Sequence, residues 1–127
     1  MNFNNFTIKA QEVVQKAQQI AHEYGHQLIE NTHIFKAILN TDENATPFIL
    51  KKLGVNIAVF EEVIKRSLEN YPKVSGGTVA LSRTSNNTLL DAGNIAKKMK
   101  DEFVAVEHLL LALLKNKDVI SQQLKDQ

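Results

Sequence analysis

The sequence contains no cysteine and no tryptophan, and these absences exclude several classes of protein. Without cysteine there are no disulfides, no thiolate nucleophile and no cysteine-based metal site, and the composition suits a reducing compartment. Aromatic residues make up only 6% of the chain, so the core must be built mostly from leucine, isoleucine, valine and alanine. We expect a cytoplasmic protein.

The sequence also lacks an excess of positive or negative charge, and it lacks long apolar runs. The formal net charge is +1, which gives no reason to expect binding to nucleic acid or to an acidic membrane. No stretch approaches the roughly 18 apolar residues of a membrane span. The first five residues lack the basic and apolar segments of a signal peptide. At 127 residues, the chain is long enough for one domain.

The apolar residues that are present recur at helical spacing. From Thr7 onward one helical face carries mostly apolar residues, namely Ile8, Ala10, Val14, Ala17, Ile20 or Ala21, and Tyr24. Gly25 is suited to end this helix, because glycine tolerates a positive φ after the last turn. No segment shows the period-two alternation of a β-strand. We therefore predict an all-α fold.

Capping residues divide the rest of the first half into three further helices. One is predicted for residues 31–39, with Asn31 or Thr32 as its cap. The next is predicted to begin at Thr46-Pro47, since proline is tolerated at the first helical position. Asn56 is predicted to cap the fourth helix, which the proline at position 72 stops.

Residues 70–80 form the only segment rich in glycine, proline and serine, and we predict a linker there. The helical pattern resumes afterward at residues 82–99, 106–114 and 118–124.

The two halves of the sequence are related. A shift of 75 residues aligns 7–40 with 82–115 without a gap, and the identical pairs are Ala17 with Ala92, Ile20 with Ile95, Ala21 with Ala96, His33 with His108, Ala37 with Ala112 and Leu39 with Leu114. The matches fall mainly on the predicted inward faces. We predict two tandem, pseudo-symmetric four-helix repeats, at about 6–71 and 81–127. The second lacks a counterpart of the last helix, so we expect the sequence to be a fragment of a longer protein.

Several of these segments resemble the Clp N-terminal repeat. The resemblance rests on Phe6-Thr7-x2-Ala10, on Ile20-Ala21, on the helix that carries His33, and on the string from Glu107 to Leu114. It covers the whole chain, and the opening residues and Asn31-Thr32-His33 look more like the ClpB type than like ClpA or ClpC.

The resemblance implies a module that binds protein substrates for an attached ATP-dependent disaggregase. The implied parent is a hexameric ring that uses ATP and magnesium to thread unfolded or aggregated polypeptide through its pore. The alternatives are a ClpC- or ClpA-type domain that docks adaptors for a protease, and a free-standing helical interaction protein. None of the five glycines belongs to a phosphate-binding loop, so we expect no ATP binding or cofactor in this chain.

Catalytic and metal sites are not indicated. Ser82, Ser85 and Ser121 lie at predicted helix starts, where hydroxyls serve as caps, and no nucleophile has a base and acid beside it. His22 and His26 are four residues apart, a spacing that could hold zinc, but Gly25 separates them at the predicted helix end. His33 and His108 are equivalent across the repeat, which favours a packing or capping role.

Candidate binding residues come from the differences between the repeats. Gln15 is replaced by Leu90, and Lys36 by Leu111, so the second repeat has leucine where the first is polar. These leucines either line an exposed substrate groove or pack between the copies or under a missing helix. The predicted groove lies between the helices at 82–99 and 106–114, and its lining is Val79, Leu81, Leu89, Leu90 and Leu111.

Two further residues match positions that the ClpB family is thought to use in substrate handling. They are Thr7 and Glu107, which we place at the rim of the groove. The alternative for both is ordinary helix-start chemistry, with Thr7 as a hydroxyl cap and Glu107 as a carboxylate favoured by the positive helix end.

Overall fold

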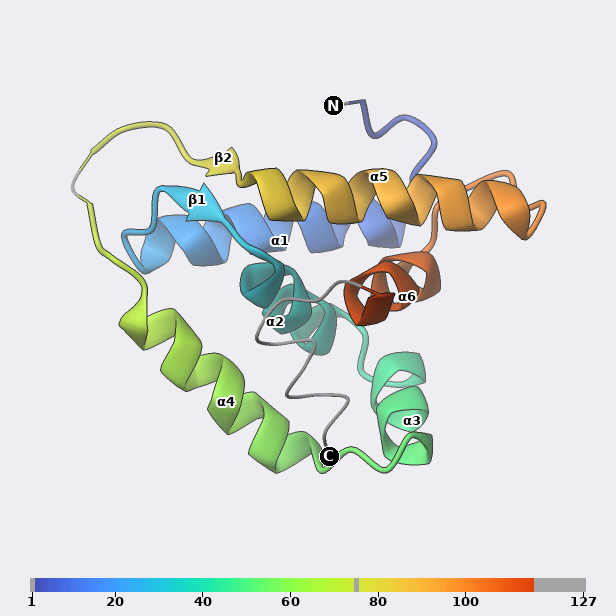
Figure 1. The fold of residues 1–127 in the computed structure, drawn as a ribbon, viewed down its shortest axis with the longest axis horizontal. Helices are drawn as coiled ribbons and strands as arrows, with labels where there is room; N and C mark the ends of the chain where they lie inside the picture. The colour runs from blue at the N-terminus through green and yellow to red at the C-terminus, as the bar shows by residue number, and fades with distance from the viewer. Residues whose placement is uncertain (1, 75, 116–127) are drawn as a thin grey trace.

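A computed structural model describes residues 2–74 and 76–115. Six helices are present in this part of the chain, and Figure 1 shows them arranged around α2. They are α1 (Ile8–Glu23), α2 (Asn31–Thr41), α3 (Ala45–Lys52), α4 (Ile57–Asn70), α5 (Arg83–Lys98) and α6 (Val106–Lys115). Two short strands, β1 (Leu28–Ile29) and β2 (Ala80–Leu81), complete the fold. The helix predicted at 118–124 lies outside the described residues.

The helices repeat at the spacing predicted from the sequence. The α1 and α5 helices each have 16 residues, and the second begins 75 positions after the first. Their caps are equivalent, since the Ala10 amide donates to the Thr7 hydroxyl in one and the Ser85 amide donates to the Ser82 hydroxyl in the other. The helical, tandem-repeat fold is confirmed.

The turns after α1 and α5 are equivalent too. Gly25 ends the first with a φ of 74°, and Lys100 ends the second with a φ of 60°. In both turns a backbone N–H reaches back to close the helix, from His26 to the Ala21 carbonyl and from Asp101 to the Ala96 carbonyl. The sequence pattern predicted the glycine but gave no sign that a lysine would adopt the same left-handed conformation.

The repeats are joined by reciprocal backbone pairing that the sequence pattern did not predict. The strands β1 and β2 pair in parallel, with Ile29 opposite Leu81. At the equivalent place in the other repeat, Phe6 forms an isolated parallel bridge with Val104. Each repeat therefore supplies the extended segment that pairs with the other. Two-residue strands are too short to show a period-two pattern, which explains why the sequence predicted none.

The core is built mostly from aliphatic side chains around α2. This helix contacts α1, α3, α4, α5 and α6, and most of its first eight residues are buried. Phe35 of α2 and Phe60 of α4 meet edge to face, with ring centroids 5.2 Å apart. Ile8, predicted on the inward face of α1, is instead 78% exposed because it occupies the first turn, beyond the packed part of the helix.

Two helix starts differ from the prediction. The α2 helix is capped by Glu30, in a capping box with His33, rather than by Asn31 or Thr32, which are buried inside it. The α3 helix begins at Ala45, one residue before the predicted Thr46-Pro47 start. Asn56 caps α4 as predicted, accepting from the Val59 amide.

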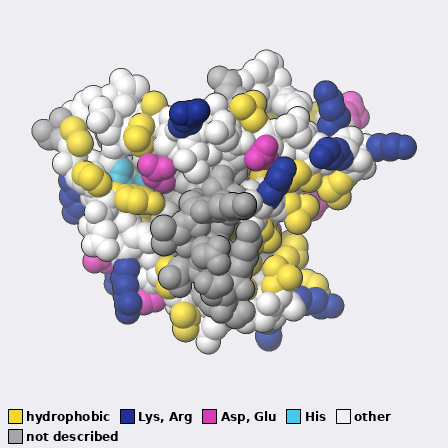
Figure 2. Space-filling model, in the orientation of Figure 1, with side chains coloured by type: hydrophobic (Ala, Val, Ile, Leu, Met, Phe, Trp, Pro, Cys, Tyr) yellow, Lys and Arg dark blue, Asp and Glu magenta, His cyan; other side chains and the backbone are white. Residues whose placement is uncertain are grey.

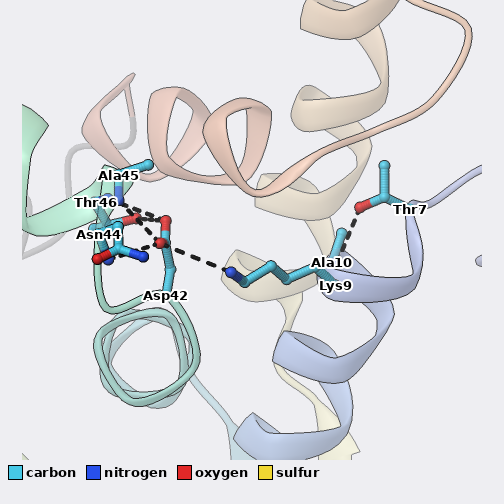
Figure 3. A network of polar contacts seen from close by, with 7 residues as sticks. All are labelled: Thr7, Lys9, Ala10, Asp42, Asn44, Ala45 and Thr46. Carbon is cyan, nitrogen blue, oxygen red and sulfur yellow. Dashed lines mark hydrogen bonds and ion pairs between the residues drawn. The ribbon is translucent and has the colours of Figure 1, made fainter.

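A buried carboxylate organises the corner between α2 and α3 (Figure 3). Asp42 accepts hydrogen bonds from the Asn44, Ala45 and Thr46 amides and from the Thr46 hydroxyl, at 2.8–3.2 Å. Burial alone raises the pKa of Asp42, but the bond from the Thr46 hydroxyl and those from the amides outweigh it, and the pKa lies below its usual value. The carboxylate thus supplies the partners that the first N–H groups of α3 lack.

Candidate functional site

The residues predicted to line one groove are not gathered in one place. Val79 and Leu81 lie at the β1–β2 pairing, which leads into the N-terminal end of α5. The loop into α6 follows the opposite end of α5 (Figure 1), and Glu107 lies in the first turn of α6. Val79 lines a surface hollow together with side chains of α1, including Gln15 and His22.

Leu89 is a core residue and not part of any surface. Its side chain is 1% exposed, because it lies on the face of α5 that packs into the core with Ala92 and Ala96. The prediction that Leu89 lines a groove was therefore wrong.

Leu90 and Leu111 are exposed. Leu90 is 52% exposed on α5 and Leu111 is 44% exposed on α6. The equivalent positions in the first repeat hold Gln15, which is exposed, and Lys36, which is half-buried. Their exposure argues against packing between the repeats, while the other two expected roles, an exposed groove and a contact under a further helix, both fit it.

Thr7 and Glu107 lie near the same corner of the molecule. The Thr7 amide donates to the Val104 carbonyl at 2.9 Å, and Glu107 stands in the first turn of α6, three residues further along. Both helix-start roles exist as well, since the Thr7 hydroxyl caps α1 (Figure 3) and Glu107 is the acidic residue in the first turn of α6.

This corner contains functional candidates that the sequence pattern did not reveal. Ile8, beside Thr7, and Phe103, beside Val104, are large apolar side chains with substantial exposure. Asp101 is also exposed and lies close to Glu107. One signal was available in the sequence, since the repeat aligns Phe103 with Leu28, and each is an apolar residue followed by another apolar residue, Val104 or Ile29.

Asp101, Glu107 and His108 each bring one potential ligand atom within 4.8 Å of the others. The hydrogen bonds of His108 determine whether its ring has a lone pair available for a metal. The Ala105 amide donates to His108 Nδ1 at 2.8 Å, so the neutral ring carries its proton on Nε2. That Nε2–H donates to the Asp101 carboxylate at 2.8 Å. A metal would need the lone pair that Nε2 lacks in this tautomer, so the cluster is a hydrogen-bonded histidine–carboxylate arrangement.

In the first repeat, His33 has the equivalent place and the equivalent capping bond. The Glu30 amide donates to His33 Nδ1 at 2.8 Å, so capping, one of the two roles expected for the repeat-equivalent histidines, is present in both repeats. The other ring nitrogen, Nε2, lies 2.8 Å from Nδ1 of His26. His26 is thus engaged with His33, rather than with His22 in a zinc site.

Comparison with known proteins places the chain in a family. Residues 5–127 match the family model described as the Clp repeat (R) N-terminal domain. The chain belongs to this family. It is 49% identical over 126 residues to the chaperone protein ClpB of Bacteroides thetaiotaomicron, and 39% identical over 126 residues to that of Porphyromonas gingivalis. In each case the alignment covers 99% of this chain and 15% of the relative's length.

Solved structures agree with the family assignment. The Hsp104 N-terminal domain of Candida albicans superposes with a TM-score of 0.82 at 25% identity, over 97% of this chain and 79% of that one. The N-terminal domain of the chaperone ClpD of Arabidopsis thaliana superposes with a TM-score of 0.77 at 18% identity, over 99% and 86% of the two chains, which shows the shared fold. Within residues 2–74 and 76–115, no helix has the length and apolar character needed to cross a bilayer.

Proposed function

We propose that this Clp repeat domain binds unfolded or aggregated protein chains and delivers them to ATP-hydrolysing modules of a ClpB-type disaggregase. The parent would be a cytoplasmic hexamer that uses ATP and magnesium, and this domain would contribute no catalytic group. The relatives that support the ClpB type are named chaperone proteins, and the chain matches only 15% of their length. The length of the natural reading frame would distinguish such a parent from a free-standing interaction protein.

The observation that supports substrate binding is the exposure of Leu90 and Leu111. The sister repeat carries Gln15 and Lys36 at these positions, so the fold itself does not require leucine there. Exposed leucines at such positions suit the recognition of unfolded segments, which present apolar side chains and free backbone. The binding should be weak, because a disordered chain loses conformational entropy when it is ordered on a shallow surface.

Thr7 and Glu107 form the proposed rim of this surface, and Asp101 joins them. Two carboxylates close together favour a positively charged side chain, so substrate segments that combine leucine-like and basic residues should bind best. Val79 and Leu81 are half-buried against the core at the far end of α5. We assign them a secondary contact at most.

The test is a titration of the 127-residue chain with reduced, carboxymethylated α-lactalbumin, followed by backbone amide shifts. The double variant Leu90→Gln, Leu111→Lys restores the residues of the first repeat, and it should keep its helicity while losing most of the binding. Val59→Gln is the matched control, because Val59 is a comparably exposed apolar residue on α4. Undiminished binding in a folded double variant would place the substrate surface elsewhere.

A further inference from the structure

A buried pair of histidines lies in the first repeat, away from the proposed substrate surface. His26 and His33 are both buried, and their rings meet at an angle of 65° with centroids 5.1 Å apart. Nδ1 of His26 lies 2.8 Å from Nε2 of His33. No helix cap requires His26, so the pair has a property that the proposed function does not use.

The hydrogen bonds determine where the protons are. His33 Nδ1 accepts from the Glu30 amide, so the neutral ring carries its proton on Nε2 and donates it to His26 Nδ1. His26 must then carry its own proton on Nε2, an atom that is buried without a hydrogen bond of standard geometry. A second proton on His33 would have to occupy Nδ1, where it would meet the Glu30 N–H. A second proton on His26 would oppose the N–H of His33.

The pair also holds the end of α4. The Tyr71 ring, immediately after this helix, meets His26 edge to face with centroids 5.3 Å apart and lies 5.7 Å from the His33 ring. Its hydroxyl lies 2.7 Å from the Thr32 hydroxyl of α2. The Val74 amide, three residues further on, donates to the Gly25 carbonyl at 2.8 Å. The two rings therefore connect the turn after α1, the start of α2 and the chain that leaves α4.

We propose that the His26–His33 pair is an acid-sensitive latch: protonation breaks its hydrogen bonds, separates Tyr71 from the start of α2, and frees the chain that follows α4. The proposal stands apart from the substrate-binding function, since it concerns the first repeat alone.

A cavity beside the pair gives the latch room to open. It holds about 180 Å³ and is lined by residues of the turn before α2 and of the chain after α4, namely His26, Gln27, Leu28, Glu30, Tyr71, Pro72 and Val74. Figure 2 shows hydrophobic side chains beside a histidine and an acidic group at the edge of the molecule where Figure 1 places β1 and the end of α4. Opening the latch would expose the buried part of Tyr71 and the two histidine rings to solvent.

Burial and the neighbouring positive charges both disfavour the protonated form of the closed pair, so acid favours opening. Burial lowers the pKa of His33 to about 4, with the neighbouring His26 acting in the same direction. Burial also lowers the pKa of His26, with some opposition from the Leu68 carbonyl, and Lys73 adds to the lowering. The other ionisable groups around the pair are Tyr24, stacked on His26, Tyr71, and Glu30, whose carboxylate accepts from the His33 amide in the capping box.

The sign of the pH effect follows from these directions. The closed pair binds fewer protons than the open one, so closure is complete above the ordinary histidine pKa of about 6.5 and is lost as the pH falls below it. For one ring, lowering the pH from 7 to 5 should multiply the opening equilibrium roughly twentyfold.

The second repeat provides an internal control. Asp101 occupies the position equivalent to His26 and accepts the same bond from His108 at 2.8 Å, with its side chain 44% exposed. The Asp101 carboxylate can accept from the His108 Nε2–H whichever protons that ring carries, whereas a second proton on His26 occupies the nitrogen that accepts from His33. The second repeat should therefore lack the latch.

The experiment compares two backbone amides by hydrogen exchange at pH 7 and pH 5, as protection factors corrected for intrinsic rates. The Val74 amide donates to the Gly25 carbonyl beside the pair and reports on the latch, whereas the Val104 amide donates to the Asn5 carbonyl near α6 and serves as the reference. Protection of Val74 should fall about twentyfold or more relative to Val104. Equal changes at the two amides would overturn the proposal.

Matched variants separate the latch from general acid lability. His26→Asp should give the first repeat the arrangement of the second and abolish the differential loss at Val74. His22→Gln, at an exposed histidine, should leave that loss unchanged. If His26→Asp is unstable, the unsubstituted chain still decides the question, because persistent protection of Val74 at pH 5 contradicts the proposal.

Discussion

His26 and Asp101 occupy equivalent positions 75 residues apart, and each accepts a 2.8 Å hydrogen bond from the histidine that caps the next helix. The same backbone geometry therefore holds a buried imidazole in one repeat and an exposed carboxylate in the other. The repeats share their folding pattern but differ in which groups they place at the ends of their helices.

The turns after α1 and α5 allow a direct test of backbone strain. Lys100→Gly should stabilise the fold by about 0.5–1 kcal/mol, because a lysine at a φ of 60° carries the steric cost of the left-handed region. Gly25→Ala should destabilise by about 1 kcal/mol. A Cβ at Gly25 would meet Lys73 Cβ at 3.8 Å, an ordinary contact, so its cost is conformational. Urea unfolding measures both variants, and a destabilised Lys100→Gly would show that the lysine side chain itself contributes more than its strain costs.

Much of the fold could be predicted from the sequence because packing constrains residue choice. The alanine pairs Ala17 with Ala92 and Ala21 with Ala96 are buried on the packed faces of α1 and α5, and their recurrence revealed the repeat. The His26–His33 contact could not be predicted, since the matching position holds Asp101 and an unlike pair gives no signal.

The burial of Leu89 could also have been predicted. Leu89 and Leu90 are adjacent in the sequence and both apolar, yet one is in the core and the other on the surface. The repeat separates them, since it aligns Leu89 with the apolar Val14 and Leu90 with the polar Gln15.

Leu89 and Leu90 should therefore respond very differently to substitution. Leu89→Ala should cost about 2–5 kcal/mol of stability, because it leaves a cavity beside Ala92 in a fully packed region. Leu90→Gln should change stability by less than about 0.5 kcal/mol, as expected for an exposed helical position. Thermal or urea unfolding of the two variants gives the comparison. Similar losses for both would mean that Leu90 is packed in solution.

The Asp42 network should make stability depend on pH in acid. Because hydrogen bonds hold the pKa of Asp42 below its usual value, its contribution is present above about pH 4 and is lost as the pH falls through the lowered pKa. Asp42→Ala should cost about 2 kcal/mol at pH 7 by leaving the first amides of α3 without partners, and should flatten the acid dependence.

The ion pair of Lys9 with Asp42 should matter far less than these hydrogen bonds. The Lys9 Nζ lies 3.9 Å from the carboxylate and the lysine side chain is 52% exposed, so Lys9→Met should change stability by less than about 1 kcal/mol. Figure 3 shows both contacts reaching the same carboxylate. A loss in Lys9→Met that equals the loss in Asp42→Ala would contradict this ranking.

The corner at Thr7 and Val104 offers a second route to substrate binding, and its contribution can be separated from that of Leu90 and Leu111. Ile8→Ser and Phe103→Ser remove exposed apolar side chains on either side of the backbone bond between Thr7 and Val104, without disturbing that bond. If the proposed surface extends around this corner, each should weaken the binding of carboxymethylated α-lactalbumin several-fold while leaving the melting temperature nearly unchanged. Glu107→Gln should also weaken this binding, and more so at low salt, because salt screens the carboxylate and reduces its contribution.

Phe48→Ser on α3 is the matched control, since Phe48 is comparably exposed and lies in the first repeat. Equal effects of Phe48→Ser and Phe103→Ser would show that the chain binds unfolded protein through scattered apolar side chains, with no preferred surface.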